Sequence, residues 1–190
     1  MRIVLIVVAA IVAVILIIPA FVDKEVKFTK TIEISKPVDQ VYNVVKDFNF
    51  YKKWNVWSQM DKDAVGELSG PVGEVGSKWS WNGDTVGVGS LTIEELVPDQ
   101  SIISKLEFKA PMQAVAQDLW KFDMIDSSTT KVSWSYAGTV DSYFARYGNL
   151  FLENVIGPDY EKGLSNLKEL VESLKPVQVD STMTTGEMTD

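Results

Sequence analysis

The chain has 190 residues, 46% of them hydrophobic, and its 26 acidic and 18 basic side chains give a net charge of −8. It contains neither cysteine nor histidine, which excludes disulfides, triads built on those residues and ordinary zinc or haem sites. We therefore expect no metal and no cofactor. The acidic balance also argues against nucleic acid as a partner, because nucleic-acid-binding proteins usually present a basic patch.

The first segment, residues 3–22, is a run of 20 residues that carries no charge and is interrupted only by Pro19. A helix of that length spans about 30 Å, the thickness of the hydrocarbon core of a bilayer. A cleaved signal peptide is the alternative, but its apolar region is usually only about 7–15 residues long. The run therefore predicts a single transmembrane anchor. Arg2, which precedes it, favours a cytoplasmic N-terminus and an extracytoplasmic domain, although three lysines follow the run.

Residues 26–175 are predicted to form one folded domain, and the polar tail 176–190 is predicted to be disordered. Apolar and polar residues alternate over 26–34, which predicts a half-buried strand. Pro37 and a helical spacing of apolar residues then predict a helix up to about Phe48, followed by a short helical turn.

The middle of the domain is predicted to be a meander of six antiparallel strands joined by turns rich in Gly, Asn, Asp and Pro. These strands are expected at 65–68, 78–81, 86–97, 101–109, 115–125 and 131–138. Gly87 and Gly89 lack the third glycine and the following helix of a phosphate loop. We interpret them as a bend or bulge that helps the sheet to curl.

The last element is predicted to be a long helix, because apolar residues recur from Tyr160 to Leu174 at spacings of 4, 3, 4 and 3. It is expected to extend backward to Leu150, with a kink or break at Gly157-Pro158. The predicted class is α+β: a curved antiparallel sheet wraps on the C-terminal helix, which leaves a cavity between them.

Several motifs share an order and spacing with a known family. They are Lys30–Tyr42, Trp54-Asn55-Val56-Trp57, Val75–Gly83, Gly87–Ile93 and Gly163–Lys168. Together they resemble the START-like superfamily, also called SRPBCC, in its polyketide cyclase/dehydrase-like branch, over about residues 26–174. A proline common in the family near the Trp-x-x-Trp segment is missing here. The resemblance implies a helix-grip fold with a cavity for an apolar or amphipathic molecule. Because members include lipid carriers, receptors and cyclases, it does not fix the function.

Nine side chains are candidates for the ligand-binding wall of that cavity. They are Trp57, Trp79, Trp81, Phe108, Asp118, Trp120, Phe122, Trp134 and Tyr136. Strand alternation puts the aromatic residues of each strand on one face, where they form either a cavity wall or a packed core. Asp118 shares a face with Trp120 and points inward unless a bulge near Pro111 turns it outward. A buried carboxylate would hold the polar end of a ligand or act as an acid or base.

Three further charged sites are candidates. Alternation puts Glu95 on the inner face of its strand, unless, as for Asp118, a bulge turns it outward. Arg146 is the only arginine of the domain, and it pairs either with an anionic head group or with a neighbouring acid. Asp61-x-Asp63 is interpreted as a solvated loop, because it lacks the glycine and distal glutamate of a calcium loop.

The sequence thus favours a membrane-anchored domain that binds or carries a small apolar or lipid-like ligand. No catalytic residue is assigned, and a protein partner is left open. One alternative is a polyketide cyclase or dehydratase that would use Asp118 and Tyr136, since histidine is absent. The other is a protein-interaction module at the membrane with a collapsed cavity.

Overall fold

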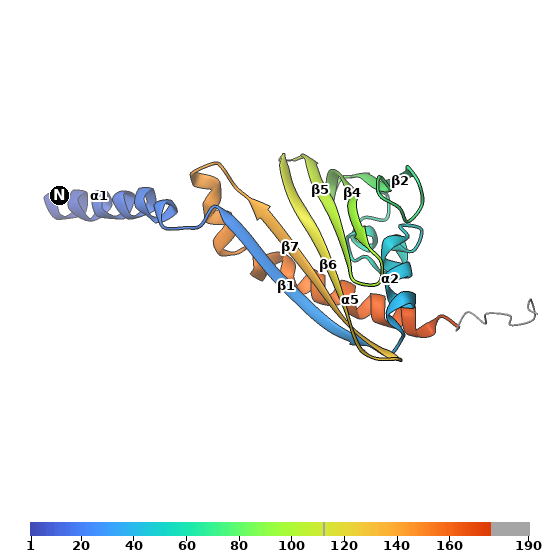
Figure 1. Ribbon diagram of the computed structural model, residues 1–190. Helices are drawn as coiled ribbons and strands as arrows, with labels where there is room; N and C mark the ends of the chain where they lie inside the picture. Colours follow the sequence, from blue (N-terminus) through green and yellow to red (C-terminus); the bar gives the residue numbers. More distant parts are fainter. Residues whose placement is uncertain (112, 176–190) are drawn as a thin grey trace, which may run out of the picture.

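The structure is a computed structural model that describes residues 1–111 and 113–175. An N-terminal helix, α1 (Arg2–Ile17), continues into a short 3-10 turn, η1 (Ile18–Ala20), and extends away from an α+β domain (Figure 1). No residue of α1 is buried, and the stretch Arg2–Ala20, with a mean hydropathy of 3.4, is long and apolar enough to cross a membrane. The tail predicted to be disordered, 176–190, lies outside the described residues.

The domain is built on one antiparallel sheet of seven strands in the order β1-β7-β6-β5-β4-β3-β2. The strands are β1 (Glu25–Ile34), β2 (Val65–Ser69), β3 (Lys78–Gly83), β4 (Gly87–Val97), β5 (Ser101–Ala110), β6 (Ala114–Asp126) and β7 (Thr129–Thr139). From β2 to β7 each strand pairs with the next along the chain, so the predicted meander is confirmed. The first strand closes the other edge by pairing with β7 from Glu25↔Thr139 to Ile34↔Thr130.

Short helices and one long helix complete the domain. They are α2 (Val38–Lys46), α3 (Tyr51–Trp54), α4 (Trp57–Met60), η2 (Phe144–Leu150) and α5 (Leu152–Ser173). Figure 1 shows α5 running along one face of the curved sheet, with α2 near its far end. Tyr160, Leu164, Leu167 and Val171 of α5 are buried, as their helical spacing predicts. The predicted helix-grip arrangement of the α+β class is therefore confirmed.

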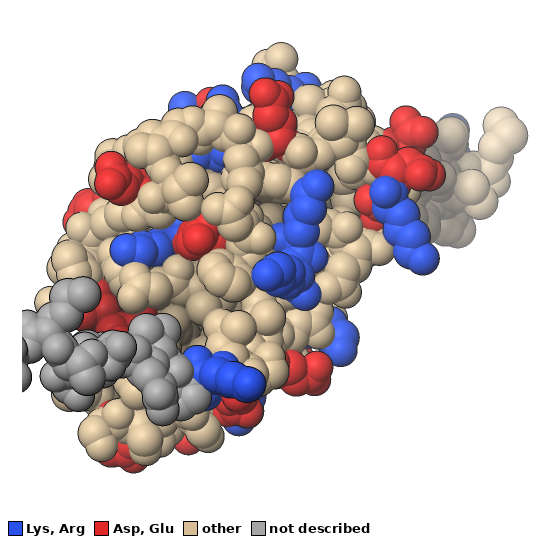
Figure 2. Space-filling model, turned by 90° about the vertical axis from the view of Figure 1, so that its right-hand side faces the viewer, with Lys and Arg blue, Asp and Glu red and all other residues tan. Residues whose placement is uncertain are grey.

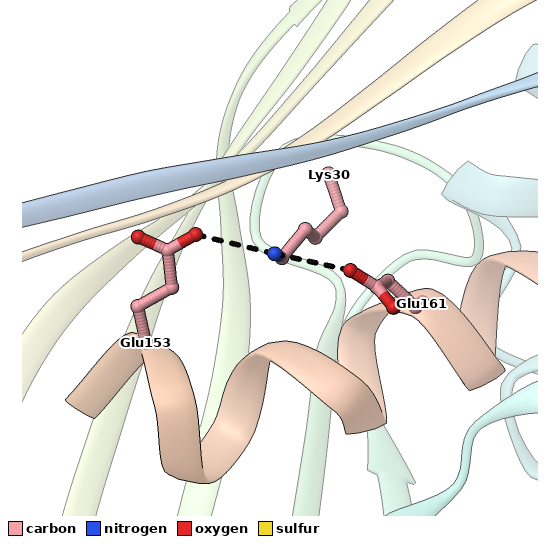
Figure 3. A network of polar contacts seen from close by, with 3 residues as sticks. All are labelled: Lys30, Glu153 and Glu161. Carbon is pink, nitrogen blue, oxygen red and sulfur yellow. Dashed lines mark hydrogen bonds and ion pairs between the residues drawn. The ribbon is translucent and has the colours of Figure 1, made fainter. Parts of the chain in front are cut away.

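The C-terminal helix was expected to kink or break at Gly157-Pro158, and the structure contradicts the break, because α5 continues through both residues. Lys30 of β1 crosses α5 at Gly157 and pairs with Glu153 at 3.2 Å and Glu161 at 3.0 Å (Figure 3). The two acids lie one turn before and one turn after the glycine, so one lysine holds both sides of the segment against the sheet. They raise the pKa of Lys30, Glu161 more than Glu153. Pro158 thus stays inside a continuous helix.

The bend or bulge predicted at Gly87 and Gly89 of β4 is confirmed. The β4–β5 register shifts between Val88 and Gly89, and Gly87 has a positive φ of 68°. A Cβ at Gly89 would lie 2.3 Å from the Trp81 ring and 2.5 Å from the Glu107 carbonyl oxygen. Glycine therefore lets this strand bend and lets an aromatic ring lie flat against it.

Candidate functional site

A cavity of about 450 Å³ lies between the sheet, where side chains of β3 to β7 line it, and the helices α3, α4 and α5. Seven of the nine predicted residues line it: Trp57, Trp79, Trp81, Phe108, Asp118, Trp134 and Tyr136. Alternation on the strands is the reason, because it directs the side chains at positions 79 and 81, and those at 134 and 136, to the face that α5 covers. Whether these residues bind a ligand stays a prediction.

The other two predicted residues, Trp120 and Phe122, are buried in the core and do not line the cavity. The Trp120 ring stacks on Trp134 with centroids 4.5 Å apart. Phe122 meets the edge of Tyr42 from α2 at 5.6 Å. They share the inner face of β6 with Asp118, but the strand carries them away from the cavity and under α2.

Asp118 lies in the cavity wall and is only 4% exposed. The β5–β6 register is regular on both sides of its partner Ser104, so no bulge turns it outward. Its two carboxylate oxygens accept hydrogen bonds from two indoles, Oδ2 from Trp120 Nε1 at 2.7 Å and Oδ1 from Trp134 Nε1 at 2.6 Å. No lysine or arginine pairs with it among the described residues.

Burial dominates the acid–base behaviour of this site. It raises the pKa of Asp118 from 3.8 to about 6, although the indole hydrogen bonds from Trp134 and Trp120 act in the opposite direction. Burial also raises the pKa of Tyr51, Tyr136 and Tyr160. These three phenols stay protonated at neutral pH and are available as hydrogen-bond donors to a molecule in the cavity.

Several lining residues were not singled out from the sequence, Tyr51 and Asn55 among them. Tyr51 begins α3 and Asn55 caps its C-terminal end, where the Asn55 backbone amide donates to the Tyr51 carbonyl at 2.9 Å. Asn55 is 1% exposed, and its Oδ1 accepts the Ser58 amide at 3.1 Å, whereas its Nδ2 has no partner among the described residues. A buried donor without a partner is costly, so this amide marks a second polar point beside Asp118. Tyr160 also lines the cavity, and the sequence pattern assigned it only to the core stripe.

The interpretation of 61–63 as a solvated loop holds for Asp63, which is exposed in a turn, and is wrong for Asp61. Its side chain is buried, and Oδ2 accepts the Thr85 amide at 2.9 Å. Backbone N–H donors, that of Thr85 foremost, hold the pKa of this carboxyl below its usual range. Asp61 therefore ties the end of α4 to the turn between β3 and β4 at the rim of the cavity.

Glu95 and Arg146 lie outside the cavity lining. The β4–β5 register shifts between Ile93 and Glu95, so the alternation that predicted an inward Glu95 breaks there and the side chain is exposed. Arg146 lies in η2, with its guanidinium over the ring of Tyr143 at 5.8 Å. No group of three potential metal ligands occurs in the part of the chain that the structure describes.

Trp134 is packed so closely against α5 that a side chain added at Gly163 is expected to destabilise the domain. A Cβ at Gly163 would lie 2.8 Å from Trp134 Cζ3, and Trp120 stacks on Trp134 at 4.5 Å. We expect Gly163→Ala to lower the free energy of unfolding by about 1–3 kcal/mol through overpacking, despite the better helix propensity of alanine. Chemical denaturation should detect the loss. Gly148→Ala, which meets nothing within 4 Å, is the matched control, and an equal effect of both would contradict the explanation.

The curved sheet, the long helix and the cavity lined by aromatic side chains define a helix-grip α+β domain. The family model for polyketide cyclase / dehydrase and lipid transport matches residues 25–172. The chain therefore belongs to this family, which confirms the resemblance found in the sequence. No curated protein sequence matches the chain.

Solved structures agree on the fold at low sequence identity. Zhui aromatase/cyclase from Streptomyces sp. R1128 is 15% identical with a TM-score of 0.58, and the match covers 78% of this chain and 94% of that one. Norcoclaurine synthase from Thalictrum flavum, in complex with dopamine and hydroxybenzaldehyde, is 13% identical with a TM-score of 0.62 and coverage of 84% and 93%. Protein CV1439 from Chromobacterium violaceum is 17% identical with a TM-score of 0.56 and coverage of 78% and 97%.

Proposed function

We propose that the protein is a membrane-anchored binding protein that holds or carries a small apolar or lipid-like molecule in the aromatic cavity. The cavity itself carries this proposal. Its volume of about 450 Å³ lies in the range of roughly 300–1,000 Å³ that is usual for small-molecule sites. Aromatic side chains form a large part of its wall. Its polar and charged groups lie at Asp118, Asn55 and the cavity-facing tyrosines, and at Lys52, Ser58, Asp61, Lys62 and Thr85.

The polar groups indicate the kind of ligand. An apolar body would pack on Trp79, Trp81 and Phe108, while a polar end would reach Asp118 or the Asn55 amide. The family description, which includes lipid transport, supports this class of ligand. We propose further that α1 anchors the chain in a membrane and that Arg2 keeps the N-terminus cytoplasmic, with the domain on the extracytoplasmic side.

Charges at one end of the molecule argue against a nucleic-acid site there. Figure 2 shows the end of the molecule opposite α1, where Lys and Arg are interspersed with Asp and Glu and do not gather into one basic patch. A protein that binds nucleic acid needs a continuous set of cations to neutralise phosphates.

The test uses residues 24–175, which contain the whole buried core, since α1 contributes no buried residue and the core cluster begins at Phe28. The fragment should release an apolar molecule on organic extraction, detected by mass spectrometry, or bind an apolar fluorescent probe. A fragment that releases nothing and binds no apolar probe or lipid would reject the proposal.

Filling the cavity should weaken the binding of the apolar probe. Leu106 lines the cavity in the middle of β5, and Leu106→Trp adds a ring to that space. We expect probe affinity to fall about tenfold or more, equivalent to about 1.4 kcal/mol. Leu68→Trp, at an exposed position on β2, is the matched control. Equal affinity in the wild type and Leu106→Trp would mean that the probe binds elsewhere.

Asp118 supports a second candidate, an enzyme of the cyclase or dehydratase kind. A buried carboxyl with a pKa of about 6 in a cavity wall is suited to proton transfer near neutral pH. Aromatase/cyclase activity is named for one protein of the same fold. In that case Asp118→Asn would remove turnover of a polyketide-like substrate while ligand binding remains. Unchanged turnover would remove Asp118 from the mechanism.

A further inference from the structure

An apolar surface surrounds the point where α1 joins the domain. It is formed by exposed side chains of Phe21, of η2 and its flank, and of the first turn of α5; we call it the η2 face. Its members are Phe21, Tyr143, Phe144, Leu150, Phe151 and Val155. Phe144 is 58% exposed, Phe151 60% and Val155 68%. Large apolar side chains that gather on one exposed surface usually mark a contact with a partner or a membrane.

The η2 face is fixed to the last turns of α1. Pro19 has no N–H, so the carbonyl of Ile15 loses the donor that normally lies four residues ahead. The hydroxyl of Tyr147 donates to that carbonyl. Tyr143 donates to the next carbonyl, that of Leu16, at 2.7 Å. In an apolar medium every backbone carbonyl must be satisfied by protein, so η2 supplies what Pro19 removes.

A second link joins the same parts of the chain just past the helix. Asn149 Nδ2 donates to the carbonyls of Asp23 at 3.0 Å and Lys24 at 3.3 Å. Figure 1 shows η2, at the orange end of β7, lying beside the segment through which α1 enters the domain. The η2 face therefore has little freedom to move away from the end of α1.

Helix geometry gives the depth of these contacts. Ile15 lies five residues before Ala20, the last residue of η1, or about 7 Å along the axis. The interfacial layer on each side of the hydrocarbon core is about 5–8 Å thick. The stretch Arg2–Ala20 is about as long as the hydrocarbon core is thick. If α1 spans the bilayer, Ala20 lies at the edge of the hydrocarbon and the carbonyls of Ile15 and Leu16 lie inside it, where the tyrosines reach them from η2 at the boundary.

We infer that the η2 face lies in the head-group layer of the bilayer and holds this end of the domain against the membrane. The inference rests on the proposed anchoring by α1. The segments that carry the η2 face hold charges of both signs without an excess of bases, so apolar contact and not attraction to anionic lipid drives the association. These charges are Asp23, Lys24, Glu25, Lys27, Asp141, Arg146 and Glu153. Val155 belongs to the η2 face, whereas its neighbour Ile156 lines the cavity. The two residues are consecutive, so opposite sides of the same turn of α5 would face the membrane and the proposed ligand.

The absence of cysteine makes the full-length chain suited to single-cysteine labelling. Phe144→Cys and Phe151→Cys report on the η2 face, and Val8→Cys reports on α1. Val72→Cys, on an exposed loop side chain that is 61% accessible, is the aqueous control. Each variant carries a nitroxide label in phosphatidylcholine vesicles, and its accessibility to oxygen and to a water-soluble nickel chelate is measured by electron paramagnetic resonance.

Labels at 144 and 151 are expected to lose most of their accessibility to the nickel chelate and to gain accessibility to oxygen relative to the label at 72. If the label at 8 lies in hydrocarbon while those at 144 and 151 match that at 72, the inference is overturned and the anchor stands. If the label at 8 is also aqueous, both fail. Protection that is lost on dilution of protein in lipid, or that requires anionic lipid, would also overturn it, because a second copy or charge attraction would then be the cause.

Discussion

Replacing Trp134 by alanine is expected to lower the free energy of unfolding of the domain by about 3–5 kcal/mol. Trp134 is 2% exposed. Its ring stacks on Trp120 at 4.5 Å and packs on Tyr160 of α5 at 4.1 Å. The edges of Trp54 and Trp57 meet it at 5.6 and 6.0 Å. Alanine would therefore leave a void where the sheet, α5 and the short helices α3 and α4 all meet.

Two further variants separate packing from hydrogen bonding at this position. Trp134→Phe keeps an aromatic ring but removes the Nε1 donor to Asp118, and losing one hydrogen bond to a charged group is expected to cost about 1–3 kcal/mol. Trp81→Ala, at a half-buried position on the rim, is the control for loss of a tryptophan. Urea denaturation of residues 24–175 measures all three. If Trp134→Ala costs no more than Trp81→Ala, Trp134 is not the centre of the packing.

Most of the fold could be predicted because the spacing of apolar residues and the turn residues between elements are local properties of the sequence. Alternation on the strands identified the sheet, and the stripe from Tyr160 to Leu174 identified the helix that packs on it. Continuity of α5 through Gly157-Pro158 was not predicted, because proline locally favours a break, whereas the contacts of this segment with Lys30 of β1 join residues far apart in the sequence. The exposure of Glu95 was missed because a single shift in β4–β5 pairing reverses the face of every later residue.

The candidate site was only partly predictable for a related reason. Alternation assigns a side chain to one face of the sheet, but it does not say which element covers that point of the face. Asp118 and Trp120 share a face, yet Asp118 lines the cavity while Trp120 packs behind Trp134. Asn55 was missed because its importance comes from an unpartnered buried amide, which no sequence pattern records.

Asp118 is expected to make the domain more stable in acid than at neutral pH, opposite to the usual behaviour of a carboxylate. Burial raises the pKa of this carboxyl from 3.8 to about 6 in the folded state. An acid with a raised pKa contributes stability that is fully present below its unfolded pKa, near 4, and is lost as the pH rises through its folded pKa. The change is worth about 3 kcal/mol, and its window runs from about pH 4 to about pH 7.

Asp118→Asn isolates this contribution, because asparagine keeps an oxygen that accepts from an indole but does not ionise. The free energy of unfolding of each protein is measured by urea denaturation across that window, and the variant is subtracted from the wild type. The other carboxylates titrate in both proteins and cancel. The wild type should lose about 2–3 kcal/mol relative to the variant as the pH rises from about 4 to about 7. A flat difference would mean that Asp118 is hydrated in solution, and the cavity would then be open to water instead of dry and apolar. A loss of the expected size would mean that a neutral-pH cavity contains a poorly solvated anion, which favours a ligand with a hydrogen-bond donor at its polar end.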